Sequence, residues 1–143
     1  MRSIDKVVWD DGYVIGLPNL DGEHQSLFGA VNALLDSVNR GSCIRTLQTM
    51  LESIRDFAAS HFRHEEALMQ ENGYYAYQHH KSCHDHFLAV VAEFHRQCIL
   101  GDEIAWEIGF FLQNWFTAHV GSIDMELGDF LKSHLKLGTT IDA

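Results

Sequence analysis

The sequence predicts an all-α protein, an antiparallel up-down-up-down four-helix bundle preceded by an irregular N-terminal arm. Three observations favour this fold. Four segments have helical length and repeat apolar residues at the 3.6-residue period of an amphipathic helix. The segments that join them are short, and short connections make sequential helices antiparallel neighbours. The chain has one proline, Pro18, so nothing after that residue forbids a long helix.

The elements follow in order along 143 residues, the length of one ordinary domain. Residues 1–20 contain the turn signals "DDGY" and "GLPN" and predict an arm that packs on the bundle, anchored across the bundle end by Trp9 and Tyr13. Helices are expected over about residues 21–39, 44–71, 77–99 and 103–133, the first three stopping at "RGS", "NGY" and "GD". The bundle is thus expected to span residues 21–135, and residues 136–143 to form a C-terminal tail or the start of a linker.

Composition argues against several classes of partner. Twenty acidic side chains against ten basic ones give a formal net charge of −10, which repels nucleic acid and anionic membranes. Three cysteines, Cys43, Cys83 and Cys98, form no C-x-x-C pair, which argues against a disulfide framework and fits a reducing compartment. Neither a signal peptide nor an apolar run of about 18 residues is recognisable. We therefore expect a cytoplasmic protein with no nucleic-acid partner and no membrane insertion.

Histidine is the outlier in the composition, with ten residues where average usage gives roughly three. Because a helix advances about 100° per residue, the apolar face of each predicted helix can be read from the sequence. Every one of the four faces carries histidine, and the set comprises His24, His61, His80, His84 and His119. A lone histidine on such a face is usually a hydrogen-bonded core residue. Five around one core, together with a carboxylate, favour a shared metal site.

The carboxylate belongs to the stretch "HFRHEEALM", residues 61–69. His61 and Glu65 fall within the apolar stripe, whereas His64 lies about 60° and Glu66 about 140° away from His61, toward the polar edge. A carboxylate inside an apolar stripe must be neutralised, hydrogen-bonded or bound to a metal. His64 and Glu66 are therefore expected to face solvent. The same is expected of three further histidines, while His95 lies near the stripe and stays undecided; the three are His79, His86 and His134.

Motif spacing narrows the kind of metal site without choosing the metal. H-E-x-x-H is absent, because Leu68 stands where the second histidine is needed, and no glutamate has histidine three residues later. A structural zinc site commonly uses thiolates, and no cysteine pattern is present. Imidazole with carboxylate suits iron, zinc, copper or nickel by ligand type.

The chain resembles the hemerythrins, in particular the bacterial ones, over nearly its full length. The resemblance rests on "LDGEH", "HFRHEEALM", "GYYAYQHHKSCHDHF" and "NWFTAHVGSID", with the ordered spacings H-x3-E, H-x3-H and H-x4-D. It implies a non-haem di-iron centre with a bridging oxo or hydroxo group. By resemblance one iron takes His80, His84 and His119, the other takes His24 and His61, and Glu65 and Asp124 bridge both. Only the resemblance selects Asp124, because five residues place it about 140° from His119 on an ideal helix.

The implied ligand count leaves one open position, on the iron held by two histidines. A small ligand such as O₂ or azide would occupy it, in a dry pocket that slows oxidation. By position the expected lining is Leu27, Phe62, Trp115, Phe116 and Val120. The leading hypothesis is therefore reversible O₂ binding for carriage, storage or scavenging, with no enzymatic activity in the domain itself. Two alternatives stay open. The first is an O₂- or redox-sensing domain that is fused to or partnered with a signalling module, such as a diguanylate cyclase or chemotaxis receptor. The second is a di-iron enzyme that handles peroxide or nitric oxide.

Overall fold

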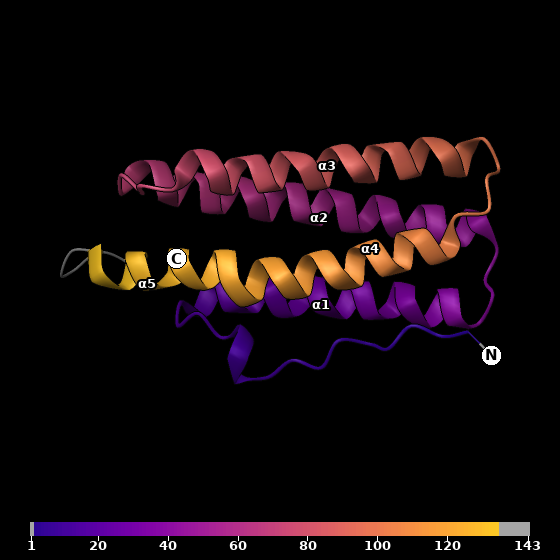
Figure 1. Cartoon of the computed structure of the whole chain (residues 1–143), viewed down its shortest axis with the longest axis horizontal. Helices are drawn as coiled ribbons and strands as arrows, with labels where there is room; N and C mark the ends of the chain where they lie inside the picture. The colour runs from indigo at the N-terminus through magenta and orange to yellow at the C-terminus, as the bar shows by residue number, and fades with distance from the viewer. Residues whose placement is uncertain (1, 135–143) are drawn as a thin grey trace.

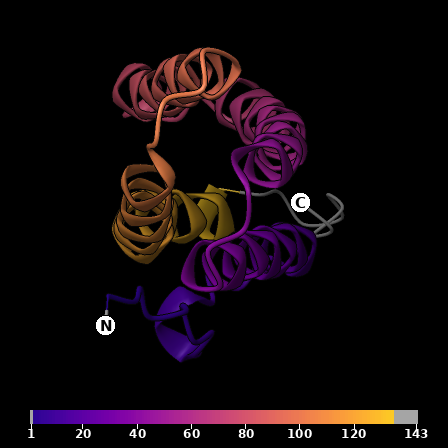
Figure 2. The ribbon, with the colours of Figure 1, turned by 90° about the vertical axis from the view of Figure 1, so that its right-hand side faces the viewer.

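The computed structural model describes residues 2–134, so the expected tail at residues 136–143 lies outside the described part of the chain. Four long helical segments pack side by side as a bundle (Figures 1 and 2). They are α1 (Pro18–Asn39), α2 (Ile44–Glu71), α3 (Tyr77–Ile99) and a fourth segment that begins with α4 (Ala105–Ala118). Helix α1 contacts α2 and α4, and α2 contacts α3. The predicted all-α four-helix bundle is confirmed.

The ends of the first three helices follow the sequence signals. Helix α1 begins at Pro18, slightly before the expected start at Asp21, because proline is well suited to the first turn. The three loops after α1, α2 and α3 contain Gly41, Gly73 and Gly101, whose φ angles are 73°, 65° and 83°. Glycine adopts this left-handed conformation without the steric penalty of a Cβ atom, which explains why each helix stops there.

The fourth segment differs from the single helix that the sequence predicts. After α4 comes a π-helical turn, η2 (His119–Ile123), and then α5 (Asp124–His134). The backbone N–H of Asp124 donates to the carbonyl of His119, an i→i+5 bond in place of the α-helical i→i+4 bond. The prediction of one uninterrupted α-helix is therefore wrong at this turn.

The N-terminal arm runs along α1 rather than across the bundle end (Figure 1). Two asparagines of α1, seven residues apart, hold it with paired hydrogen bonds. The backbone N–H of Ile4 donates to Asn39 Oδ1 at 2.8 Å, and Asn39 Nδ2 donates back to the Ile4 carbonyl at 2.9 Å. Val7 and Asn32 repeat this arrangement at 2.7 and 2.8 Å.

Aromatic packing fixes the second half of the arm. The rings of Trp9 and Tyr13 lie 5.2 and 4.9 Å from that of Phe28 in α1, centroid to centroid. Tyr13 ends the short 3₁₀ helix η1 (Asp11–Tyr13). The two aromatic residues thus anchor the arm as predicted, but on the side of the bundle.

The buried core is divided into two parts along the bundle axis. The larger contains Val31, Leu51, Phe87 and Leu112, and the smaller contains Leu20, Met69, Leu127 and Leu131. Along every helix the buried histidines and carboxylates lie at or next to the boundary between the larger and the smaller part of the core. A polar layer therefore lies across an otherwise apolar bundle.

Candidate metal centre

The polar layer contains all seven residues expected as ligands, and all are buried. Helix α1 provides one of them, α2 and α3 provide two each, and the fourth segment provides the last two. In chain order they are His24, His61, Glu65, His80, His84, His119 and Asp124. Their ligand atoms form two overlapping groups that share the two carboxylates, with the atoms of each group within 4.8 Å of one another.

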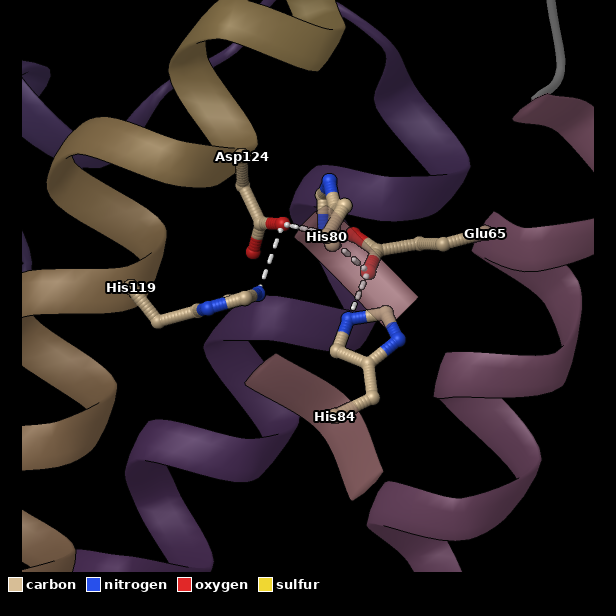
Figure 3. Close-up of side chains that lie close together, drawn as sticks. All are labelled: Glu65, His80, His84, His119 and Asp124. Atoms are coloured by element: carbon tan, nitrogen blue, oxygen red, sulfur yellow. Dashed lines mark ion pairs between the residues drawn. The ribbon is translucent and has the colours of Figure 1, made fainter. Parts of the chain in front are cut away.

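The first group contains three histidines (Figure 3). His84 Nε2 lies 3.1 Å from Glu65 Oε1, and His80 Nε2 lies 3.0 Å from Asp124 Oδ1. His119 Nε2 lies 3.2 Å from the same Asp124 oxygen. Three imidazoles from α3 and the fourth segment thus point at one oxygen of each carboxylate.

The second group contains two histidines and uses the other carboxylate oxygens. His24 Nε2 lies 3.2 Å from Glu65 Oε2 and 3.1 Å from Asp124 Oδ2. His61 Nε2 lies 3.2 Å from Glu65 Oε2. Each carboxylate therefore presents one oxygen to each group, which is the arrangement needed to bridge two ions.

The π-helical turn explains how Asp124 reaches the site. On an ideal α-helix Asp124 would point about 140° away from His119 around the helix axis. The i→i+5 bond between these two residues widens the turn and places them on one face. Asp124 is consequently 1% exposed, with its carboxylate beside the His119 ring.

The residues present fit two metal ions. In the described part of the chain, six buried atoms that face the centre lack a hydrogen-bond partner of suitable geometry, although they lie close together: Glu65 Oε1, Nε2 of His80, His84 and His119, and both Asp124 oxygens. Buried polar atoms rarely stay unpaired. Two ligands at right angles, each ~2.1 Å from an ion, lie roughly 3 Å apart, which matches the spacings above. Imidazole with carboxylate also suits transition metals.

Two carboxylates outside the ligand set orient ligand rings. His61 Nδ1 donates to Glu23 Oε1 at 2.5 Å, and His84 Nδ1 donates to Glu66 Oε2 at 2.8 Å. Because a carboxylate only accepts, Nδ1 of each ring carries a proton, which leaves Nε2 as the nitrogen that would bind a metal ion. The expectation that Glu66 faces solvent is wrong, since its side chain is only 17% exposed. The contact with His84 shows that α3 covers the flank of α2 on which Glu66 lies.

The metal-free cluster balances its own charges. Burial opposes protonation of His24 and His80, but the neighbouring carboxylates of Asp124 and Glu65 outweigh it and raise the pKa of each ring to about 9. Burial likewise opposes protonation of His61. The negative charge of Glu65 and the hydrogen bond from His61 to Glu23 outweigh burial and raise the pKa of His61 to about 10. Burial raises the pKa of Glu65 and Asp124, yet the surrounding histidines hold both well below the ordinary range. Metal ions must therefore displace protons from the imidazoles.

The expected pocket residues lie around this layer. The Phe62 ring stacks on that of His84 at a centroid distance of 3.9 Å, and Trp115 stacks on His119 at 4.3 Å. Both contact rings of the three-histidine group. The other three, Leu27, Phe116 and Val120, are 1% exposed. Contact of any of the five with a bound ligand stays a prediction.

The remaining histidines lie outside both ligand groups. As expected, three are exposed: His79, His86 and His134. His95 is partly buried, with Nε2 3.2 Å from Glu52 Oε2. His64 is 36% exposed, but its Nδ1 lies 3.0 Å from Glu23 Oε2, so the expectation that it is simply solvated is incomplete.

A four-helix bundle that encloses two overlapping ligand groups around shared carboxylates defines a metal-binding protein with room for two ions. The chain belongs to the hemerythrin family, since the hemerythrin HHE cation binding domain matches residues 16–131. This confirms the family resemblance read from the sequence.

Individual relatives agree with this assignment. A bacteriohemerythrin of Stenotrophomonas maltophilia (strain R551-3) is 32% identical over 130 residues, covering 90% of this chain and 84% of the relative. A hemerythrin from Sipunculus nudus is 28% identical over 127 residues, covering 89% and 95%. A crystal structure of wild-type hemerythrin superposes with a TM-score of 0.80 at 26% identity, covering 87% of this chain and 97% of the other. Within residues 2–134, no helix combines the length and apolar character needed to cross a membrane.

Proposed function

We propose that this protein binds O₂ reversibly at a di-iron centre. The proposal places one iron at His80, His84 and His119 and the other at His24 and His61, with Glu65 and Asp124 bridging. When bound, two ferrous ions supply the two electrons that reversible O₂ binding requires. Hemerythrin family membership and the buried ligand cluster support the choice of iron and of O₂.

The observation that carries the proposal is the unequal number of histidines. One group has three imidazoles and the other has two, around the same pair of carboxylates. The two-histidine ion thus has one protein ligand fewer, which leaves a position for a small exogenous ligand such as O₂ or azide. The buried apolar side chains of Leu27, Phe116 and Val120 would keep water from the layer and so slow oxidation of the metals.

The experiment is anaerobic reconstitution with Fe²⁺ followed by exposure to air. We expect two iron ions per chain, a visible ligand-to-metal absorption band in air, and loss of that band under vacuum over repeated cycles. Azide added to the oxidised protein should give a distinct band at the same site. A colourless protein with one zinc ion, or a band that never reverses, would contradict reversible O₂ binding.

The sensory and enzymatic alternatives remain predictions. The sensory alternative depends on the tail, which lies outside the described residues. The enzymatic alternative needs a proton donor beyond the ligands, and none is identified in the described chain. Slow oxidation of the O₂-bound protein would favour a carrier or store over a sensor.

A further inference from the structure

Glu23 contacts two histidines at once, and only one of them is a metal ligand. Its Oε1 accepts from His61 Nδ1 at 2.5 Å, and its Oε2 lies 3.0 Å from His64 Nδ1. Glu23 comes from α1 and both histidines from α2, one turn apart. The contacts form a chain from the metal-facing ring of His61 through Glu23 to His64 near the surface.

The exposure of these side chains shows why a second contact matters. His61 is 2% exposed, but the Glu23 side chain is 29% exposed and that of His64 is 36% exposed. A glutamate this accessible can rotate into water, and holding it in one rotamer costs side-chain entropy. A hydrogen bond from His64 to the outer oxygen restricts that rotation while the inner oxygen stays on His61 Nδ1.

The structure assigns His64 as a positioning residue that holds Glu23 against His61 and so helps to retain the metal ion bound at His24 and His61. The inference rests on metal binding, which is part of the proposed function, but not on O₂. It needs His64 as an N–H donor only. His64 belongs to neither ligand group, and its Nδ1 lies 3.0 Å from Glu23 Oε2 and 3.3 Å from Glu23 Oε1.

The other ion provides an internal comparison. Glu66 accepts from His84 Nδ1 at 2.8 Å, and in the described structure no second histidine contacts Glu66. Loss of His64 should therefore affect the two-histidine ion and leave the His84–Glu66 pair unchanged. A general loosening of α2 would instead affect both pairs, because Glu66 and His64 both belong to that helix.

The test uses Zn²⁺, a diamagnetic ion that accepts imidazole and carboxylate ligands. In the Zn²⁺-loaded full chain, NMR should show one slowly exchanging Nδ1–H signal each for His61 and His84. Glu23→Gln should weaken the first signal and Glu66→Gln the second, which assigns them. Release of Zn²⁺ to an excess of chelator is then followed for each variant.

In His64→Ala we expect the His61 signal to shift and exchange faster while the His84 signal stays unchanged. Release of one of the two Zn²⁺ ions should accelerate about threefold to tenfold, less than the ~10–100-fold expected for Glu23→Gln, which loses the direct partner. His64→Asn should restore both the signal and the slow release, because its amide N–H takes the place of Nδ1–H. His86→Ala, an exposed histidine on α3, is the control and should match the wild type.

Unchanged release and an unchanged His61 signal in His64→Ala would overturn the positioning role while leaving the metal site intact. Failure of His64→Asn to rescue, or equal changes in both signals, would also overturn it. If the wild-type chain retains no Zn²⁺ and no Fe²⁺, the proposed function fails together with this inference. Irreversible reaction with O₂ in a protein that holds two metal ions would count against the proposed function only.

Discussion

His119 is held in the site from both sides. Its Nε2 lies 3.2 Å from Asp124 Oδ1, and its ring stacks on Trp115 with planes 11° apart. Asp124 is shared between both ligand groups, so a change at His119 affects the charge balance of the whole centre. Among the single residues of the site, His119 therefore links metal binding to the stability of the buried carboxylates.

Replacing His119 with alanine removes one of three imidazoles from the first group. We expect His119→Ala to lower iron content from two ions per chain to about one or fewer. The metal-free variant should also lose about 3 kcal/mol of unfolding free energy, because a buried carboxylate loses a partner and a cavity opens. Metal analysis and urea denaturation measure the two effects. The exposed His79→Ala is the control; two iron ions retained by His119→Ala would contradict its placement as a ligand.

Helix periodicity alone predicts most of the residues of the metal centre from the sequence. It predicts the inward faces of His61 and Glu65 because both belong to one strongly amphipathic helix. It does not show that Glu23 and Glu66 orient ligand rings, since each partner lies on a different helix and only packing brings them together. The same reasoning predicts that His64 faces solvent and that its substitution does not affect metal binding. The contact between His64 and Glu23 predicts instead that substitution of His64 accelerates metal release.

At the scale of an element, the π-helical turn has the largest consequence. The i→i+5 bond from Asp124 to His119 encloses one residue more than an α-helical turn, and this places Asp124 in the ligand layer. The amphipathic pattern continues on both sides of the turn, so periodicity predicts one unbroken helix. Only the H-x4-D spacing signals the insertion, and its meaning depends on family resemblance.

Two glycines beyond α4 face the N-terminal arm, and we expect their replacement by alanine to have different effects on the free energy of unfolding. A Cβ atom at Gly128 would lie 2.7 Å from Ile15 Cβ and 3.0 Å from the Ile15 carbonyl oxygen, so the arm would have to move. At Gly121 the nearest atom would be Tyr13 Cε1 at 3.6 Å, an ordinary contact. Gly128→Ala should lower the unfolding free energy by about 1–3 kcal/mol. Gly121→Ala should leave it unchanged or raise it by up to ~1 kcal/mol.

Urea denaturation of the metal-free proteins separates the two glycine variants, with each serving as the control for the other. Equal destabilisation by both would show that the fourth segment tolerates no side chain facing the arm. Destabilisation by Gly121→Ala alone would contradict the packing described for Ile15.

At the scale of the whole molecule, the bundle places a charged layer inside an apolar core. Burying such groups is costly unless they are paired, and without metal the pairing is between protonated imidazoles and the two carboxylates. With metal bound, the ions replace those protons. The pH dependence of stability should therefore have opposite sign in the two states of the protein.

In the metal-free protein, His24 and His80 have a pKa of about 9 and His61 of about 10, above the ordinary value of 6.5. A histidine whose pKa is raised on folding stabilises the folded state fully below pH 6.5, and this contribution is lost as the pH rises through the folded-state pKa values of about 9 to 10. Glu65 and Asp124, with lowered pKa values, act in the other direction and lose their contribution only in acid. We expect the melting temperature of the metal-free protein to fall by roughly 10 °C or more between pH 6.5 and 9.5.

The iron-loaded protein gives the matched measurement, because its imidazoles must be deprotonated to bind the metals. Its melting temperature should hold or rise over the same interval and fall in acid, where protons compete for the ligands. The gap between loaded and metal-free protein should thus widen steadily from pH 6.5 to 9.5, a range below the titration of ordinary tyrosines. Parallel curves in calorimetry would mean that the histidines are neutral without metal. The buried carboxylates would then need another source of positive charge, and the described core contains no buried lysine or arginine to supply it.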